Sequence, residues 1–248
     1  MSIFVFVFGL LIGSFLNVCI YRIPKEESIA YPPSHCTSCN NRIKSYDLIP
    51  VISWILLKGK CRHCKEKISV RYTLVELFTG VIYLSLFLKY GLTLEFLKFI
   101  ILSSFLIVIG LIDYDTTDVY TVTTWVPIII GALFIGYKAY VGQDYLTYIY
   151  GFLACGGIIA LIILLTKGMG WGDAEICALG GIFLGLSNGL LMMLLSFVIG
   201  GTVGAYLLAT KKKSRKDYIP FGPYIAMAAI IVSLFGSYIL EWYMKTFL

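Results

Sequence analysis

The sequence has 248 residues, of which 59% are hydrophobic, and its mean hydropathy is +0.87. Soluble domains are roughly 45 to 50% apolar with glycine included, so this composition excludes an ordinary soluble protein. The net charge of +6 is better explained by basic loops beside anionic lipid than by nucleic-acid binding. We therefore expect an integral membrane protein that contacts membrane lipid and no nucleic acid.

Apolar runs of about 17 to 25 residues cross a membrane as helices, and the sequence has eight candidates. They lie near 3–21, 73–90, 96–113, 122–140, 146–166, 174–187, 188–209 and 221–244. The sixth is short, and its boundary with the seventh rests on Leu186-Ser187-Asn188-Gly189, so seven spans are an alternative. We expect an all-α polytopic membrane protein with about eight transmembrane helices.

Three regions follow from this pattern. Residues 1–21 form the first transmembrane helix, which has no basic start and no small-residue cleavage site and is interpreted as a retained span. Residues 22–72 form a polar loop, and residues 73–248 form a contiguous transmembrane bundle. No internal repeat or low-complexity segment is evident.

The basic residues predict the orientation. Residues 22–71 include ten basic and four acidic side chains, an excess that is typical of cytoplasmic loops. With eight spans, Lys167 and the basic run 211–216 fall on the same side, so 16 of the 20 Lys and Arg are cytoplasmic. Segment 113–121 and the start of the sixth span then lie at the cytoplasmic boundary.

The polar loop contains two C-x-x-C pairs separated by twenty-one residues. Paired thiolates at this spacing favour a tetrahedral zinc site, and four sulfur ligands leave no open position, so the zinc is structural. The alternatives are two disulfides or four unligated thiols. A cytoplasmic loop is kept reduced, which disfavours disulfides, and four unligated cysteines in paired spacing would be a coincidence. His35 and His63 flank the pairs and are alternative ligands. The predicted ligands are Cys36, Cys39, Cys61 and Cys64.

Ionisable side chains at membrane depth are costly unless they are paired or hydrated, so each one is a functional candidate. Asp113 directly continues the third apolar run. On a helix Asp115 points about 200° away from it, and both Asp115 and Asp118 resemble solvated turn residues. Asp173 follows the glycine-rich stretch 167–172 at the start of the sixth span. Asp113 and Asp173 are therefore the candidate catalytic pair.

Two aspartates that share a proton have a well-defined chemistry. One carboxylate takes a proton from water while the other donates a proton to the scissile carbonyl, as in aspartic peptidases. The G-x-G-D pattern alone is a weak signal, because Asp173 also fits an ordinary helix cap and glycines also serve helix packing. The residues alone are equally compatible with catalysis and with a structural role.

A series of short motifs extends nearly from end to end of the chain and resembles the bacterial type IV prepilin peptidases, which are also prepilin N-methyltransferases. Each motif is modest alone, but the whole series in order is specific. The motifs are Gly13-Ser14-Phe15-Leu16-Asn17-Val18, Arg22-Ile23-Pro24, the two C-x-x-C pairs, Tyr46-Asp47-Leu48-Ile49-Pro50, Ser53-Trp54, Gly59-Lys60-Cys61-Arg62, Arg71-Tyr72-Thr73-Leu74-Val75-Glu76-Leu77, the Asp113 segment, Gly170-Trp171-Gly172-Asp173 and Ile219-Pro220-Phe221-Gly222-Pro223.

The resemblance implies an enzyme of the bacterial inner membrane. Such enzymes cut the basic leader from prepilins and pseudopilins after a glycine on the cytoplasmic side. They then methylate the new N-terminal residue, usually phenylalanine, with S-adenosylmethionine. The resemblance implies that Asp113 and Asp173 are catalytic, and it links Gly59 and Lys60 to methyl transfer. It also implies a role in type IV pilus assembly, secretion or competence.

The sequence departs from the family after the first catalytic aspartate. Members often have a proline and then Asp or Asn at positions where this chain has Tyr120 and Thr121. The loop after Asp113 is therefore expected to differ in shape from that of other members. Two polar residues keep two interpretations each. Glu76 fits either a receptor for the basic leader or a salt bridge to Arg71 or another cytoplasmic cation. Asn17 is expected to hydrogen-bond within the bundle rather than contact substrate.

Two other functions are compatible with these residues. A presenilin-like intramembrane aspartic protease also uses G-x-G-D and has Tyr-Asp in its other motif, as Tyr114-Asp115 does here. Such an enzyme would use Asp115 in place of Asp113. A non-enzymatic zinc-loop scaffold or transporter would use the boundary carboxylates to carry protons or ions, and it would leave a prepilin at full length.

Overall fold

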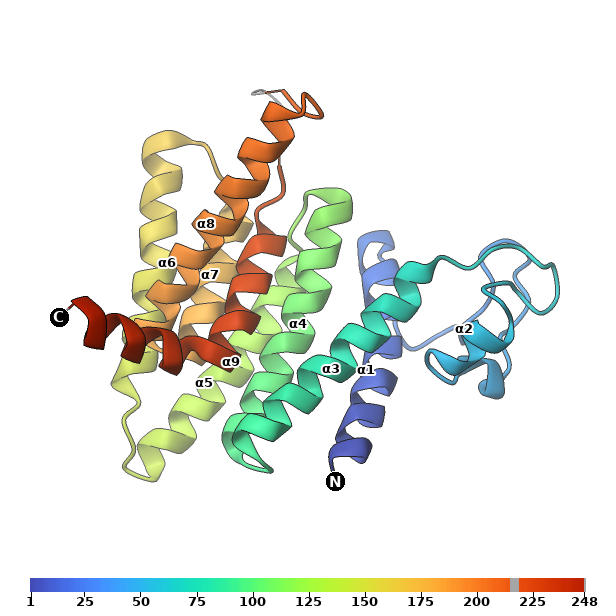
Figure 1. The fold of residues 1–248 in the computed structure, drawn as a ribbon, viewed down its shortest axis with the longest axis horizontal. Helices are drawn as coiled ribbons and strands as arrows, with labels where there is room; N and C mark the ends of the chain where they lie inside the picture. The colour runs from blue at the N-terminus through green and yellow to red at the C-terminus, as the bar shows by residue number, and fades with distance from the viewer. Residues whose placement is uncertain (215–218, 248) are drawn as a thin grey trace. The chain divides into compact units, whose positions relative to one another are not determined.

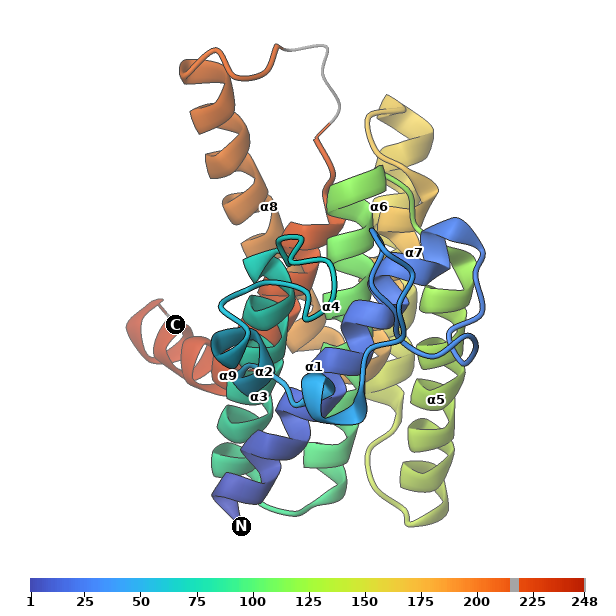
Figure 2. The same cartoon turned by 90° about the vertical axis from the view of Figure 1, so that its right-hand side faces the viewer.

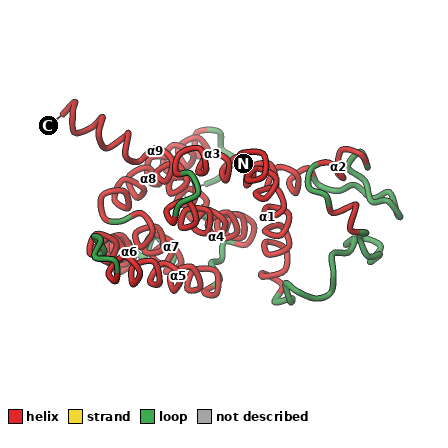
Figure 3. The backbone as a smooth tube through the Cα atoms, turned by 90° about the horizontal axis from the view of Figure 1, so that it is seen from below, coloured by secondary structure: helices red, strands yellow, loops and turns green. Residues whose placement is uncertain are grey.

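A computed structural model of the chain describes residues 1–214 and 219–247, so Arg215 and Lys216 of the basic run lie outside the described residues. The described part consists of helices and loops without a β-strand (Figure 3). The chain divides into two compact units, Met1–Phe96 and Leu97–Leu248, and each is described by itself.

Within the described residues, seven helices are long and apolar enough to cross a membrane. This arrangement confirms the all-helical membrane fold expected from the sequence. The expected sixth span corresponds to α7 (Trp171–Leu184), whose 14 residues rise only about 21 Å, less than the roughly 30 Å of hydrocarbon. The seven helices are α1 (Ser2–Arg22), α3 (Val70–Tyr90), α4 (Leu94–Thr116), α5 (Thr121–Tyr140), α6 (Leu146–Thr166), α8 (Leu186–Ala209) and α9 (Gly222–Phe247).

Helix α7 forms the centre of unit 2. It packs against α5, α6, α8 and α9, and Figure 3 shows it among these helices from below. Nearly all of its residues from Asp173 onwards are buried, so its length is set by its neighbours rather than by the membrane. It ends at Gly185, slightly before the expected boundary, because a φ of 78° with a ψ of 177° is accessible essentially to glycine alone.

In unit 1, α1 packs along α3, as Figures 1 and 2 show. Gly13 permits this approach, since a Cβ at that position would lie 2.7 Å from the Cα of Glu76. The side-chain amide of Asn17 donates a hydrogen bond to the carbonyl of Tyr72 at 2.9 Å, as expected from the sequence. Small residues and interhelical hydrogen bonds are what hold membrane helices together, and both occur at this contact.

The chain between α1 and α3 forms the polar loop. It begins with the 3₁₀ helix η1 (Ile23–Lys25) and includes a second 3₁₀ helix, η2 (Ser45–Leu48), and the short helix α2 (Ile52–Leu56). Figure 2 shows these pieces connected by extended segments. The loop has little regular structure of its own, so its shape depends on side-chain contacts and on the cysteines.

We expect Gly13→Ala to destabilise the protein by about 1 to 3 kcal/mol, because the added methyl group overpacks the contact between α1 and α3. The matched control is Gly157→Ala in α6, where an added Cβ meets nothing within 4 Å. That control should be neutral or slightly stabilising, since alanine is the better helix former. Thermal unfolding in detergent, followed by circular dichroism, measures both; equal midpoints would contradict the tight α1–α3 contact.

Candidate active site and metal centre

The polar loop brings four cysteines together, and we call Cys36, Cys39, Cys61 and Cys64 the cysteine cluster. Their Sγ atoms all lie within 4.8 Å of one another, and those of Cys36 and Cys64 are 3.8 Å apart. All four thiols are free. Sulfur atoms around a tetrahedral zinc with Zn–S bonds of about 2.3 Å are about 3.8 Å apart, so the cluster has the donors and the spacing of a metal site.

Among the described residues, the group of possible metal ligands in this loop consists of the four cysteines and includes neither His35 nor His63. The Nδ1 atom of His35 lies 3.2 Å from the carbonyl oxygen of Pro33. The arrangement therefore supports the predicted set of four sulfur ligands over a set in which a histidine replaces one of them.

The two C-x-x-C pairs lie in hairpins with the same backbone pattern. The amide of Cys36 donates to Asn41 O at 3.0 Å, and twenty-five residues later the amide of Cys61 donates to Glu66 O at 2.8 Å. In both hairpins the residue after the second cysteine has a positive φ. This repeat was not predicted from the sequence, because the two hairpins share only the cysteines and one isoleucine.

Several motif residues of the loop have structural partners. The Ser53 hydroxyl donates to Tyr46 O at 2.9 Å, and the Trp54 indole donates to Ile68 O at 3.1 Å. Gly59 has a φ of 65°, and a Cβ there would lie 2.8 Å from the Trp54 ring. Gly59 therefore supports the position of Trp54, whereas Lys60 beside it is exposed.

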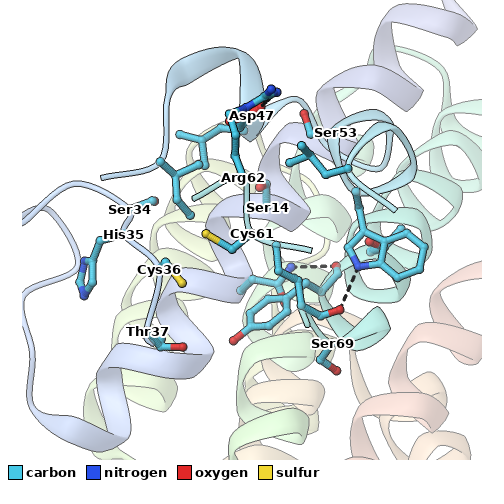
Figure 4. A pocket seen from close by; sticks show the side chains of 18 of the residues that line it. Ser14, Ser34, His35, Cys36, Thr37, Asp47, Ser53, Cys61, Arg62 and Ser69 are labelled. Carbon is cyan, nitrogen blue, oxygen red and sulfur yellow. Dashed lines mark hydrogen bonds and ion pairs between the residues drawn. The ribbon is translucent and has the colours of Figure 1, made fainter. Parts of the chain in front are cut away.

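A bidentate ion pair connects η2 to the second hairpin. Arg62 donates from Nε and Nη2 to the two carboxylate oxygens of Asp47, at 2.8 and 2.6 Å, and Figure 4 shows the two side chains together. These hydrogen bonds hold the pKa of Asp47 below its usual range. Because two parallel bonds fix both distance and orientation, the pair sets the position of η2 relative to the cysteine cluster.

Unit 1 contains a cavity of about 440 Å³, which we call the unit 1 cavity. Its lining comes from α1, from the polar loop and from the start of α3, and Figure 4 labels Ser14, Cys36, Cys61 and Arg62 among the lining residues. Cavities of roughly 300 to 1,000 Å³ are typical of small-molecule sites, so this one is large enough for a ligand.

Glu76 lines the unit 1 cavity and is 8% exposed. Its Oε2 accepts a hydrogen bond from the backbone amide of Val51 at 2.8 Å, and the Ser14 side chain is a further hydrogen-bond partner. The salt bridge to Arg71 considered from the sequence is not among the interactions of Glu76 within the described ranges.

Asp113 lies in the last turn of α4 and is 2% exposed. Its Oδ2 accepts a hydrogen bond from the backbone amide of Gly222 at 2.8 Å, at the N-terminus of α9. A carboxylate near a helix C-terminus is disfavoured by the helix dipole, whereas a helix N-terminus stabilises it. The first turn of α9 therefore supplies the N–H donor and the favourable dipole that the C-terminal end of α4 does not offer to Asp113.

Asp173 lies in the first turn of α7 and is 3% exposed. Its Oδ2 accepts a hydrogen bond from the Gly170 amide at 3.1 Å, so this carboxylate does cap the helix, as one interpretation of the sequence proposed. It is buried nevertheless, and it lies near enough to Asp113 for the two charges to interact. A Cβ at Gly172 would lie 2.5 Å from that of Val119, so this glycine permits close packing of the α4–α5 loop.

The other acidic side chains nearby differ in environment. Asp115 and Asp118 are exposed, as expected from the sequence, although Asp115 lies in the last turn of α4 rather than in a turn. Helix α4 ends at Thr116, and the next residue, Thr117, has a φ of 60°. Glu175 on α7 accepts a hydrogen bond from the Thr124 hydroxyl of α5. Of the acidic residues in this region, Asp113 and Asp173 are the buried pair.

The backbone donors to Asp113 and Asp173 were not predicted from the sequence. The motif at 219–223 was noted only as part of a resemblance, whereas the structure gives its glycine a partner in Asp113. A Cβ at Gly222 would lie 2.6 Å from Asp113 Oδ2. The sequence signal for this helix N-terminus is a glycine followed by proline at the start of an apolar run.

A helical membrane bundle that buries two interacting aspartates has the parts of a membrane-embedded aspartic peptidase. Two family models match the sequence: the Bacterial Peptidase A24 N-terminal domain over residues 7–90 and the Type IV leader peptidase family over residues 100–205. The relatives described next match nearly the whole chain at 30% identity or more. This chain belongs to the type IV leader peptidase family.

The similar curated proteins carry the name prepilin leader peptidase/N-methyltransferase. That of Pseudomonas putida is 33% identical over 259 residues, which cover 93% of this chain and 89% of the relative. That of Aeromonas hydrophila is 32% identical over 98% of this chain and 94% of its own length. That of Bacillus subtilis is 30% identical over 97% and 96%, respectively. No solved structure matches.

We expect the purified protein to contain about one zinc ion per chain, because the cysteine cluster has four sulfur donors at tetrahedral spacing. Cys36→Ser and Cys61→Ser should each lower the zinc content strongly, since one ligand is lost in each. Cys19→Ala, which changes a buried cysteine of α1, is the matched control and should retain the metal. Elemental analysis by mass spectrometry measures the content; full zinc in both serine variants would contradict the assignment.

Proposed function

We propose that this chain is a bifunctional enzyme that removes the basic leader of prepilins and pseudopilins after a glycine, and then methylates the new N-terminal residue. The observation that carries the peptidase activity is the pair Asp113 and Asp173, two buried carboxylates that each accept a hydrogen bond from the backbone amide of a glycine at a helix N-terminus. Family membership supplies the substrate class and the second activity.

Hydrolysis uses the two carboxylates in different protonation states. Like-charge repulsion between Asp113 and Asp173 favours a single shared proton. The ionised carboxylate takes a proton from water, whose oxygen attacks the carbonyl carbon, while the protonated one donates to the carbonyl oxygen. The amide nitrogen then takes a proton, and the carbon–nitrogen bond breaks without a covalent enzyme intermediate.

Backbone amides hold the pair in place for this chemistry. Gly222 fixes one oxygen of Asp113 and Gly170 fixes one oxygen of Asp173, which leaves the other oxygen of each carboxylate for water and substrate. Gly170, Gly172 and Gly222 have no side chain, so the backbone beside the carboxylates can be approached closely.

The shape of the substrate fits a site at the membrane boundary. A prepilin begins with a basic leader followed by an apolar helix, so the leader stays in water while the helix lies in the bilayer. The basic residues of the polar loop support a cytoplasmic location for that loop and for the ends of the spans beside Asp113 and Asp173. The proposed location is therefore the inner membrane, with cleavage on its cytoplasmic face.

Methyl transfer is assigned to unit 1. S-adenosylmethionine, the donor that the family implies, supplies a methyl group bonded to a positively charged sulfur. The unit 1 cavity is large enough for a small-molecule ligand, and Trp54 and Arg62 are among its lining residues. Gly59 acts by supporting Trp54, and Lys60 by its exposed charge beside the second hairpin. Zinc in the cysteine cluster has a structural role.

A presenilin-like protease that uses Asp115 is a weaker candidate, because Asp115 and Tyr114 are exposed whereas Asp113 is buried. A scaffold or transporter would use boundary carboxylates to carry protons or ions, a role that suits exposed groups better than Asp113 and Asp173, which are buried. Neither alternative accounts for Gly222, whose amide is committed to Asp113.

We expect Asp113→Asn and Asp173→Asn each to lower leader cleavage by about 10²- to 10⁴-fold, because each removes a proton donor or acceptor from the reaction. A prepilin co-expressed with each variant should remain at full length on a gel, and mass spectrometry of the product from the wild type should show an added methyl group. An unmethylated product, with donor present, would remove the second activity from the proposal.

Asp115→Asn is the matched control and should cut at the normal rate, because its side chain is exposed. Loss of cleavage in Asp115→Asn together with full cleavage in Asp113→Asn would favour the presenilin-like alternative. A wild-type protein that leaves the prepilin uncut would favour the scaffold or transporter.

We expect Gly222→Ala to lower cleavage by about 10²-fold, because the added methyl group displaces the Asp113 carboxylate and an error of about 1 Å in a catalytic group has that effect. The matched control is Gly201→Ala in α8, where an added Cβ meets nothing within 4 Å. The rate of cleavage of a purified prepilin measures both variants. Equal rates for the two variants would contradict the positioning role of Gly222.

A further inference from the structure

The unit 1 cavity contains a buried charge that the peptidase mechanism does not use. Glu76 is 8% exposed, and within the described ranges its partners are the Val51 amide and the Ser14 side chain. No lysine, arginine or histidine of those ranges forms an ion pair with it. Buried carboxylates are normally paired with a cation, so a cavity-lining carboxylate without one suits a positively charged ligand.

The backbone beside Glu76 supports a ligand site. Val51 has a φ of 64° and a ψ of −53°, and the amide of Ile52 donates to Pro50 O at 2.6 Å. Residues 50–52 therefore form a γ-turn of the rare form with positive φ, which is strained for a β-branched residue. Strained backbone of this kind is concentrated at ligand sites, and here the amide of the strained residue is held by Glu76.

The position of Glu76 along α3 favours one of two possible cationic ligands, the basic leader and the α-amine of the cut pilin. It is the seventh residue of α3, which places it about 9 Å along the helix, inside the apolar segment rather than in the loop. Long basic side chains of a leader keep their charged ends in water. The amine that remains after leader removal is attached directly to an apolar helix. It can therefore reach a carboxylate inside the apolar segment, as Glu76 is.

We propose that Glu76 binds the α-ammonium group of the cut pilin in the unit 1 cavity and accepts one of its protons. This assignment rests on the proposed methyl transfer, and it gives the second reaction a catalytic residue. It differs from binding of the leader, because the group that is recognised exists only after cleavage.

The proton transfer is needed because an ammonium group has no lone pair. Ionised Glu76 takes one proton from the α-ammonium and becomes neutral, which leaves a neutral amine. The amine nitrogen forms a bond to the methyl carbon of the sulfonium donor, and the carbon–sulfur bond breaks with its electron pair remaining on sulfur. The products are a methylated ammonium and a neutral thioether, and Glu76 returns its proton to water.

Glu76→Gln separates the charge of this side chain from its shape. The amide oxygen of glutamine still accepts a hydrogen bond from Val51, so the γ-turn keeps its partner. Glu76→Ala removes both the charge and the acceptor, whereas Glu76→Asp keeps the charge. Glu27→Gln, which neutralises an exposed acid outside the cavity lining, is the matched control for a change of one charge.

The experiment compares two ligands for each variant in lipid nanodiscs. One is mature pilin obtained by cleavage without methyl donor, and the other is the same pilin with its α-amine acetylated. Wild type and Glu27→Gln should bind the free amine at least about tenfold more tightly than the acetylated form, as expected for a charge-assisted hydrogen bond. Glu76→Gln should bind both equally, and Glu76→Asp should recover part of the preference.

Methylation and leader cleavage are measured separately on the same samples. Glu76→Gln should lower the methylation rate by about 10²- to 10⁴-fold, and raising the pH should recover part of the rate, because a neutral amine then forms without a base. Zinc content and thermal unfolding of each variant show that the fold is retained.

Three results would overturn the assignment. The first is a Glu76→Gln variant that keeps the preference for the free amine. The second is normal methylation in Glu76→Gln with loss in Glu76→Ala, which would mean that the side chain only holds the γ-turn. The third is loss of leader cleavage in Glu76→Gln, which would mean that Glu76 receives the leader. A wild type that cuts but never methylates would count against the proposed function, and the binding comparison would still decide the role of Glu76.

Discussion

Two carboxylates buried in an apolar helical bundle need hydrogen-bond donors that intact helices do not offer along their length. The amides in the middle of a helix are already bonded to carbonyls, so free donors occur only at helix N-termini. In unit 2, α7 and α9 begin beside the carboxylates, and Gly170 and Gly222 donate to Asp173 and Asp113. The N-termini of α7 and α9 therefore lie where their amides can donate hydrogen bonds to the two buried carboxylates.

This constraint also accounts for the shape of α7. Helix α7 has Asp173 in its first turn and is enclosed by its neighbours, so it need not extend to the opposite membrane surface. It ends at Gly185 after 14 residues, and α5, α6, α8 and α9 cover its sides. An otherwise regular membrane bundle thus contains one short, fully surrounded helix, and this helix carries Asp173.

Much of this arrangement could be predicted from the sequence, because long apolar runs determine where membrane helices lie. The choice of Asp113 over Asp115 also followed from the direction in which successive helical residues point, and their burial agrees with it. The amide of Gly222 could not be predicted, since it meets Asp113 across 109 residues of chain. The hairpin repeat was hidden because its hydrogen bonds are between backbone atoms, which leave almost no signal in residue identity.

The γ-turn at Val51 gives the unit 1 cavity a property that goes beyond recognition. Its amide and a cationic ligand both use the carboxylate of Glu76, so the energy of the turn and the affinity for the ligand are thermodynamically linked. Linkage is reciprocal: whatever relaxes the turn changes ligand affinity, and a bound ligand changes the stability of the turn by the same factor. Because α2 begins at Ile52, this coupling would extend from the cavity into the first turn of a helix in the polar loop.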